Sequence, residues 1–318
     1  MKKILVTLPL EPEHKEQLLS AGQGCEMCFR PVGEVDGEDI AWADILLGNV
    51  PAGMIGGAPN LEWVQLGSSG ADAYVQPGVL HPRTKLTNAT GAYSQAVAEH
   101  ALAATMMLQK NLHLYRDNQL AARWEESGYV TSIADASVAV IGLGEIGLHY
   151  ARMTKALGAY VMGVKRRPGS CPECVDELFL MDGLDEVLRR ADVVFTVLPE
   201  TPATHHLFTT ERFEIMKDSA IFINCGRGGA VAEDVLYAAL STGKIAAASI
   251  DVAEREPLPA DSPLWALSNL FITPHVSGDF HLRQTHDRVV DILSENLRRY
   301  LVGEELKNAV DFQSGYRK

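Results

Sequence analysis

One segment decides the fold of this chain: Val138-Ala-Val-Ile-Gly142-Leu-Gly144-Glu-Ile-Gly147. Its first half is an apolar run typical of a buried strand, and its second half is a Gly-x-Gly-x-x-Gly turn that opens an amphipathic helix. Such a turn holds the pyrophosphate of a dinucleotide against the helix N-terminus. The segment therefore predicts a dinucleotide-binding unit, and a tight turn without a ligand is the alternative.

A basic run, Lys165-Arg166-Arg167, follows the next predicted strand. NAD-binding proteins usually carry an Asp or Glu at this place for the ribose hydroxyls. No acidic residue occupies positions 162–167 here, and arginine binds a phosphate through two parallel hydrogen bonds. The run therefore favours NADP(H) over NAD(H), with a solvated basic turn as the alternative.

Short apolar strands alternate with amphipathic helices from residue 137 onwards. Continuous apolar strands separated by helices indicate a parallel sheet that is covered on both faces. Residues 1–90 repeat the pattern on a smaller scale. A long helix with Ser94 as its N-cap is expected between the halves, over Ser94–Leu120. The expected strands are Lys3–Leu8, Cys25–Arg30, Asp44–Asn49, Glu62–Leu66, Lys85–Asn88, Ser137–Ile141, Tyr160–Val164, Asp192–Leu198, Ala220–Asn224, Ala247–Asp251 and Leu270–Thr273. The other expected helices are Glu13–Ser20, Glu38–Trp42, Glu145–Leu157, Leu184–Arg190, Glu233–Leu240 and Leu282–Leu301.

Composition and charge restrict the class of protein. The chain has 318 residues, of which 47% are hydrophobic and 22% charged, as in a globular protein of about two domains. A net charge of −13 argues against nucleic acid or an anionic membrane as a partner. No apolar run approaches the roughly 18 residues of a membrane span, and the basic N-terminal start lacks a signal-peptide cleavage site. We therefore expect a cytoplasmic protein.

Five cysteines are too few for a disulfide scaffold of this length. Cys25/Cys28 and Cys171/Cys174 each have C-x-x-C spacing, but the two pairs lie much farther apart than the pairs of a zinc ribbon. We expect reduced thiols and no bound metal. The loop pair Cys171/Cys174 is the better candidate for redox or metal chemistry.

Three further segments follow predicted strands at the carboxyl edge of the same sheet. They place Arg227 in a glycine-rich turn, Glu256 before a proline, and His275 after Thr273-Pro274. Each alone has an ordinary explanation: a surface cation, an ion-pair partner or a core histidine. Folds of this class, however, bind cofactor and substrate at that edge. Beside a nicotinamide, the Arg supplies an anchor for an anion, the His a proton donor, and the Glu a partner that tunes the donor.

The ordered series of segments resembles the D-isomer-specific 2-hydroxyacid dehydrogenases. The resemblance implies a two-domain α/β fold in which a Rossmann-type doubly wound parallel sheet, residues 96–283, is inserted into a smaller flavodoxin-like α/β substrate domain. That second domain comprises residues 1–95 and 284–318. A homodimer is also implied. The matching segments are Gly142-Leu-Gly-Glu-Ile-Gly147, Asn224-Cys-Gly-Arg-Gly228, Ile250-Asp-Val-Ala-Glu-Arg-Glu-Pro-Leu-Pro259, Ser262-Pro-Leu-Trp265, Thr273-Pro-His275, Val97-Ala-Glu-His-Ala101 and Leu66-Gly-Ser-Ser-Gly-Ala-Asp72.

The resemblance also implies a reaction, the reduction of a 2-oxo acid to the D-2-hydroxy acid by hydride transfer. Arg227, Glu256 and His275 would be catalytic, with His275 as the proton donor. Many members carry an acidic residue near position 165, so Lys165 points to the NADP-dependent members that resemble glyoxylate/hydroxypyruvate reductases. The alternatives are an NAD(P)-sensing binding protein or corepressor of the same fold, and oxidation of formate or phosphite.

The resemblance assigns binding residues as well. Backbone amides at Ser69 and Gly70 would hold the substrate carboxylate together with Arg227, and Asp251 would orient the nicotinamide carboxamide. The expected cofactor contacts are Gly142, Gly144, Glu145, Ile146, Gly147, Lys165, Arg166, Arg167, Leu198, Pro199, Thr204, Cys225, Gly226, Asp251, His275 and Gly278.

Overall fold

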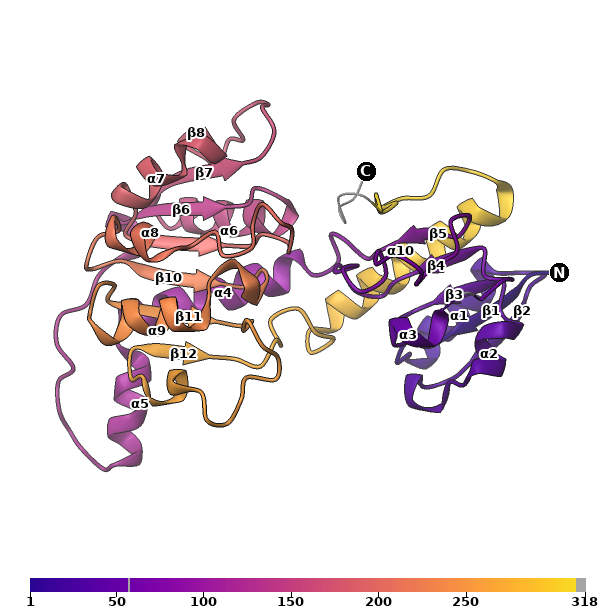
Figure 1. Cartoon of the computed structure of the whole chain (residues 1–318), viewed down its shortest axis with the longest axis horizontal. Helices are drawn as coiled ribbons and strands as arrows, with labels where there is room; N and C mark the ends of the chain where they lie inside the picture. The colour runs from indigo at the N-terminus through magenta and orange to yellow at the C-terminus, as the bar shows by residue number, and fades with distance from the viewer. Residues whose placement is uncertain (57, 313–318) are drawn as a thin grey trace. The chain divides into compact units, whose positions relative to one another are not determined.

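The computed structural model describes residues 1–56 and 58–312. The chain divides into two compact units (Figure 1): unit 1 is Met1–Tyr93 with Phe280–Lys318, and unit 2 is Ser94–Asp279. The sequence predicts these boundaries at 95/96 and 283/284, a few residues later than the boundaries at 93/94 and 279/280 in the structure. Of the expected segment 284–318, residues 313–318 lie outside the described residues.

Unit 2 is built on a sheet that, in the described residues, has seven strands in the order β12-β11-β10-β9-β6-β7-β8. All of its pairings are parallel. In chain order this is the Rossmann arrangement, extended by one strand, which confirms the predicted fold class. The strands are β6 (Ser137–Ile141), β7 (Tyr160–Lys165), β8 (Glu177–Leu180), β9 (Val193–Thr196), β10 (Ile221–Asn224), β11 (Ala247–Ile250) and β12 (Leu270–Ile272).

Helices cover both faces of this sheet because its central strands are apolar on both sides. On one face Met162 and Phe222 share a core with side chains of α7, α8 and α9. On the other face Phe195 of β9 packs on Tyr150 of α6, with ring centroids 4.2 Å apart, and α4 contacts α6. The helices of unit 2 are α4 (Ser94–Gln109), α5 (Leu112–Leu120), α6 (Glu145–Ala156), α7 (Leu184–Arg190), α8 (Thr210–Glu214) and α9 (Glu233–Ser241).

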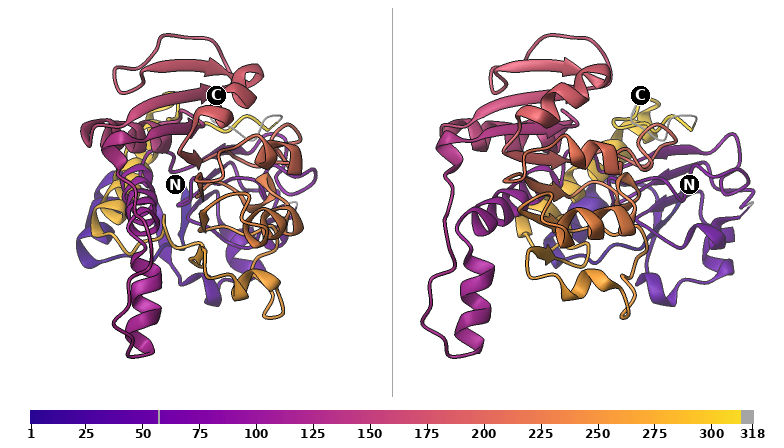
Figure 2. Two further views of the ribbon diagram at one scale, coloured as in Figure 1. Left: turned by 90° about the vertical axis from the view of Figure 1, so that its left-hand side faces the viewer. Right: turned by 60° about the vertical axis from the view of Figure 1, so that its left-hand side comes forward.

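Two features of unit 2 differ from the sequence prediction. The helix expected over Ser94–Leu120 is wrong: α4 and α5 are separate, because Asn111 adopts a left-handed backbone with φ of 54°, which Asn tolerates better than most residues. Ser94 is the first residue of α4 and not its N-cap. Strand β8 was not expected, because it is a half-buried edge strand without a strong apolar signal. After the break, α5 and residues 121–131 extend away from the sheet (Figure 2).

Unit 1 contains a parallel sheet with the strand order β2-β1-β3-β4-β5. This is the flavodoxin-like order, as predicted. Its strands are β1 (Lys3–Val6), β2 (Glu26–Phe29), β3 (Ile45–Leu47), β4 (Trp63–Gln65) and β5 (Lys85–Thr87). Its helices are α1 (Pro12–Ala21), α2 (Gly37–Trp42), α3 (Ala52–Ile55) and α10 (Arg283–Val302).

The last helix, α10, completes unit 1 although it is distant in sequence. It packs against α1 and buries Val289, Leu293 and Leu297 completely. Its Tyr300 ring stacks on Trp63 of β4, with centroids 5.0 Å apart. The apolar stripe that predicted this helix is therefore the face that packs into unit 1, and the helix brings the C-terminal part of the chain back to that unit. In the described part of the chain, no helix has both the length and the hydropathy to span a membrane.

Candidate functional site

The glycine turn joins β6 to α6, and its geometry requires glycine. Gly142 has φ of 105°, a left-handed conformation that favours glycine. A Cβ on Gly147 would lie 2.0 Å from the carbonyl oxygen of Gly142, so turn and helix meet closely only because this residue has no side chain. Helix α6 follows Gly144 without a side-chain cap, which leaves its first amides without intrahelical acceptors. This backbone fits the pyrophosphate of a dinucleotide.

The basic run lies on the strand next to the glycine turn. Strand β7 pairs with β6, and Lys165 ends β7 at the carboxyl edge of the sheet. Arg166 and Arg167 follow and are exposed. The Nζ of Lys165 donates to the carbonyl oxygen of Ser170 at 3.2 Å, so the loop folds back over this lysine. The three cations are thus one strand away from the uncapped helix.

The remaining predicted cofactor residues follow the ends of β9, β10, β11 and β12. A Cβ on Gly226 would lie 2.5 Å from the carbonyl oxygen of Leu198, so the ends of β9 and β10 are in close contact. Thr204 donates its hydroxyl to the carbonyl oxygen of Pro199 at 2.6 Å and closes the loop after β9. Gly278 lies in the loop after β12. All of these positions are at the carboxyl edge of the sheet.

His275 and Glu256 form the central side-chain contact of this edge. Glu256 follows β11 and His275 follows β12, and the Nδ1 of His275 lies 2.7 Å from the Oε2 of Glu256. The other carboxylate oxygen of Glu256 accepts the backbone N–H of Ala253 at 3.0 Å. Half of the His275 side chain is exposed, and its Nε2 has no hydrogen-bond partner among the described residues. The ring is therefore fixed at one nitrogen and available at the other.

Asp251 fixes the turn that carries His275. Its side chain is almost fully buried and accepts the hydroxyl of Thr273 at 2.6 Å and the N–H groups of Val276 and Ser277 at 3.0 Å each. The N–H of His275 donates to the backbone oxygen of Asp251 at 2.8 Å, and His275 itself has φ of 55°. The sequence suggested only a cofactor contact for Asp251. This supporting network joins residues more than twenty positions apart, and no local pattern signals it.

Arg227 sits in a turn whose shape depends on small residues and a buried amide. The fully buried Asn224 accepts the N–H of Gly226 and donates to the carbonyl oxygen of Arg227, both at 3.0 Å. A Cβ on Gly228 would lie 1.9 Å from the carbonyl oxygen of Ala253. The turn of Arg227 therefore packs directly on the loop that leads to Glu256. Sequence reasoning missed Asn224, although an Asn that ends an apolar strand is a usable signal.

Ser69 and Gly70, the predicted substrate-binding residues, lie in unit 1 in the loop after β4. Asn88 donates its side-chain amide to the carbonyl oxygen of Ser69 at 2.7 Å, and Ser68 donates its hydroxyl to that of Gly70 at 2.8 Å. The N–H groups of Ser69 and Gly70 have no acceptor among the described residues. The loop therefore presents two amides from a fixed backbone.

All five cysteines are free thiols. In the loop after β7, the Sγ of Cys171 contacts the carbonyl oxygen of Val175 at 3.3 Å, whereas the Sγ of Cys174 lies 4.0 Å from the carbonyl oxygen of Leu148. Within the described residues, no group of three or more His, Cys, Asp or Glu side chains is placed to hold a metal ion. Cys225 is buried beside the site, and burial raises the pKa of its thiol.

Comparisons with known proteins match this chain to one family. Residues 102–277 match the family model of the D-isomer specific 2-hydroxyacid dehydrogenase, NAD binding domain. Glyoxylate/hydroxypyruvate reductase B of Escherichia coli is 32% identical over 280 residues, which cover 85% of each chain.

Solved structures give the same assignment over almost the whole chain. A D-isomer specific 2-hydroxyacid dehydrogenase family protein from Aeromonas salmonicida has a TM-score of 0.87 and 32% identity, covering 98% of this chain and 99% of that one. A D-isomer specific 2-hydroxyacid dehydrogenase from Xanthobacter autotrophicus, in complex with NADPH and MES, has a TM-score of 0.83 and 30% identity, covering 99% of both chains. The chain therefore belongs to the D-isomer specific 2-hydroxyacid dehydrogenase family, and it is an oxidoreductase that uses a nicotinamide cofactor.

Proposed function

We propose that this chain reduces a small 2-oxo acid, such as glyoxylate or hydroxypyruvate, to the D-2-hydroxy acid with NADPH. One observation carries the proposal: the His275 ring is held at Nδ1 by the Glu256 carboxylate at 2.7 Å, and its Nε2 has no hydrogen-bond partner in the described part of the chain. A histidine oriented in this way transfers a proton at its second nitrogen. The 32% sequence identity with glyoxylate/hydroxypyruvate reductase B of Escherichia coli supports the substrate class.

Three side chains divide the catalytic work in this proposal. When a reduced nicotinamide is bound, it supplies the hydride that is added to the carbonyl carbon of the substrate. His275, protonated at Nε2, gives its proton to the carbonyl oxygen, which becomes the hydroxyl of the product. Glu256 orients the ring and balances its positive charge. Arg227 holds the substrate anion and stabilises the negative charge that develops on the oxygen.

The preference for NADPH rests on charge at the end of β7. The sequence has three cations at Lys165, Arg166 and Arg167 and no carboxylate over 162–167. A 2′-phosphate carries the charge that these side chains complement, whereas a free ribose diol requires an acceptor that is missing from this stretch. The Xanthobacter structure was solved with NADPH, which supports this preference.

In unit 1 we assign the substrate carboxylate to the loop after β4. The N–H groups of Ser69 and Gly70 are available, while the neighbouring carbonyl oxygens are already bonded. Two adjacent amides on a fixed backbone form a concavity that binds an anion. This loop therefore selects an acid over the corresponding neutral aldehyde or ketone.

We further propose a homodimer in which a second copy covers the segment formed by α5 and residues 121–131. This segment extends away from the sheet of unit 2 (Figure 2) and carries large, strongly exposed hydrophobic side chains. Leu120 is 70% exposed, and the relative exposures of Trp124 and Tyr129 are 103% and 104%. Exposed apolar surface of this kind marks a protein interface. Sedimentation of the wild-type chain and of a Trp124→Ala, Tyr129→Ala double variant tests the assignment, and a monomeric wild type would refute it.

The proposed activity is tested by following NADPH oxidation with glyoxylate, hydroxypyruvate and phenylpyruvate. In the control, the corresponding 2-hydroxy acid replaces each 2-oxo acid, so that any remaining loss of NADPH is not due to reduction of the substrate. We expect turnover with at least one of these acids and none with the corresponding aldehydes that lack a carboxylate. NADPH binding without turnover of any 2-oxo acid would instead favour a dinucleotide-sensing protein and would contradict the proposal.

A further inference from the structure

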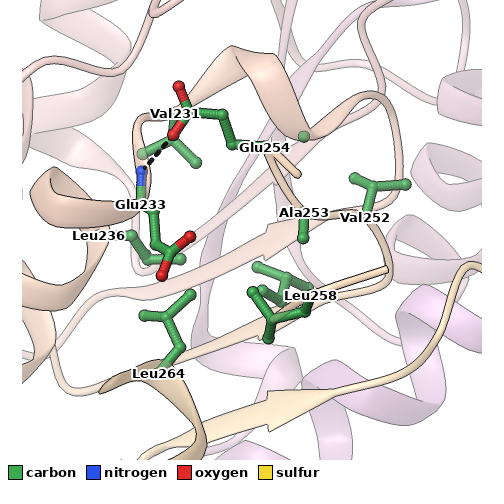
Figure 3. A pocket seen from close by; sticks show the side chains of 10 residues that line it. Val231, Glu233, Leu236, Val252, Ala253, Glu254, Leu258 and Leu264 are labelled. Carbon is green, nitrogen blue, oxygen red and sulfur yellow. Dashed lines mark hydrogen bonds between the residues drawn. The ribbon is translucent and has the colours of Figure 1, made fainter. Parts of the chain in front are cut away.

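Glu254 lies two residues before Glu256, outside the residues assigned above, and its carboxylate joins three segments of unit 2. Its Oε1 lies 2.7 Å from the Nε2 of His206, in the segment between β9 and α8. Its Oε2 accepts the backbone N–H of Glu233, the first residue of α9, at 2.9 Å. Figure 3 shows this second bond. One side chain thus connects the loop after β11 to two neighbouring segments.

The connected segments also carry the proposed catalytic residues. Gly228, next to Arg227, packs so closely on Ala253 that a Cβ would lie 1.9 Å from the Ala253 carbonyl oxygen. The N–H of His206 donates to the carbonyl oxygen of Gly229 at 2.7 Å, and His206 has a left-handed backbone with φ of 49°. The turn of Arg227 is therefore held between the loop of Glu254 and the segment of His206.

The loop of Glu254 packs closely on Gly228 on one side. A small hollow lies beside it, lined mainly by apolar side chains (Figure 3). Empty space removes the close contacts that would otherwise fix a loop by dispersion. The two polar bonds of Glu254 therefore add to the close contact with Gly228 in fixing the orientation of the loop. The apolar side chains that line the hollow are those of Val231, Leu236, Ile250, Val252, Ala253, Leu258 and Leu264.

The charge of Glu254 suits this role. Burial opposes ionisation of the carboxyl, but the N–H of Glu233 and the ring of His206 outweigh that effect and hold the pKa of Glu254 below its usual value. A carboxylate at the start of α9 is also favoured by the positive end of the helix dipole. Glu254 is thus an anion at neutral pH and accepts both bonds at once.

We propose that Glu254 is a positioning residue: it holds the loop that carries Glu256 against the turn that carries Arg227, and so sets the orientation of His275. The inference rests on the proposed function, because it takes these three residues as catalytic. Glu254 itself acts through its neighbours and does not contact the reacting atoms.

The test compares Glu254→Ala and Glu254→Gln with a matched control. Glutamine keeps an acceptor for the Glu233 N–H and a second polar atom for His206, whereas alanine loses both bonds. Glu177→Gln is the control, because Glu177 is a carboxylate of similar exposure, 36% against 29%, that also has two partners. It begins β8, at the opposite edge of the sheet.

We expect Glu254→Ala to lower kcat about 10- to 100-fold, since a misplacement of about 1 Å at a reacting group costs about 10²-fold. The KM for NADPH should change less than twofold, because the glycine turn is untouched. The pH profile of kcat should also shift, because the partner of His275 is displaced. Glu254→Gln should recover most of kcat, and Glu177→Gln should leave kcat and its pH profile unchanged.

An unchanged kcat and pH profile in Glu254→Ala would overturn the inference, as would an equal loss of kcat in Glu254→Ala and Glu177→Gln. Failure of the proposed function is recognised separately through His275→Ala. If that variant keeps full activity, the catalytic assignment fails. If it is inactive while Glu254→Ala is fully active, only the positioning role fails.

Discussion

The two ends of the carboxyl edge in unit 2 are built in different ways. At β6 and β7 the site consists of backbone and exposed surface charge: the glycine turn, the uncapped start of α6, and the side chains of Arg166 and Arg167. At β10, β11 and β12 it consists of side chains in fixed networks, in which the buried carboxylate of Asp251 alone accepts three hydrogen bonds. The first end suits recognition of a large anion, and the second suits placement of individual reacting atoms.

This difference separates the two kinds of effect that a substitution should have. Backbone amides and exposed cations contribute to cofactor affinity without touching the reacting carbonyl. Oriented side chains such as Arg227 and His275 contribute to the rate, because their interactions strengthen as charge develops in the transition state. Changes at β6 and β7 should therefore appear in Kd and KM for the cofactor, and changes at β10 to β12 in kcat.

Apart from the change of His275 itself, Arg227→Ala should have the largest effect among the variants of these two ends. It removes the cation that holds the substrate and stabilises the developing negative charge, a loss that costs about 10²- to 10³-fold. Steady-state kinetics with a 2-oxo acid should show this loss in kcat/KM for the acid, while fluorescence titration gives an unchanged Kd for NADPH. A comparable loss of NADPH affinity would mean that the two ends are not functionally separate.

Gly147→Ala should come next, and it acts on the backbone end. The added Cβ would lie 2.0 Å from the carbonyl oxygen of Gly142, so the turn must open at a cost of about 1–3 kcal/mol in the free energy of unfolding. NADPH binding should weaken with it. Gly37→Ala is the control, since its Cβ would meet no atom within 4 Å, and urea denaturation should show little change. Wild-type NADPH affinity in Gly147→Ala would contradict the assigned role of the turn.

A smaller effect is expected when Arg166 and Arg167 are both changed to alanine. The double variant should bind NADPH about tenfold more weakly, which corresponds to the loss of about one charge-assisted hydrogen bond at an exposed site. Its binding of NADH should be nearly unaffected. The Kd values for both cofactors measure this directly, with Arg298→Ala on the exposed side of α10 as a charge control. Equal weakening of both cofactors would show that the basic run is only a solvated turn.

Salt should have the smallest effect, and it should act on one end only. The exposed arginines are screened as ionic strength rises, because the Debye length falls from about 10 Å at 0.1 M to about 3 Å at 1 M. The KM for NADPH should rise a few-fold over this range, and that for NADH should rise less. A parallel change in kcat would indicate that the hydrogen-bonded end is also sensitive to screening.

The two ends also differ in how much the sequence reveals. The glycine turn and the basic run are local patterns, and the structure has β6, α6 and β7 where the pattern predicts them. Arg227, Glu256 and His275 could be proposed because each follows a predicted strand at a common edge, and His275 and Glu256 are indeed in contact.

The supports of these residues could not be predicted. Asp251 contacts the turn at 273–277, and Glu254 contacts His206, forty-eight positions away. Such contacts depend on how strands are ordered in the sheet and leave no periodic trace in the sequence. The break at the left-handed Asn111, which separates α4 from α5, could not be predicted for a different reason. Asn also occurs on polar helix surfaces, and its helix propensity is only mildly unfavourable.

His275→Ala tests most directly the claim that β10 to β12 carry the chemistry and β6 to β7 carry the binding. We expect a loss of about 10²- to 10⁴-fold in kcat for reduction of a 2-oxo acid, the usual contribution of a general acid, with a Kd for NADPH that stays within twofold of the wild type. A kcat that falls only slightly, or a Kd for NADPH that rises in step with the loss of kcat, would contradict it.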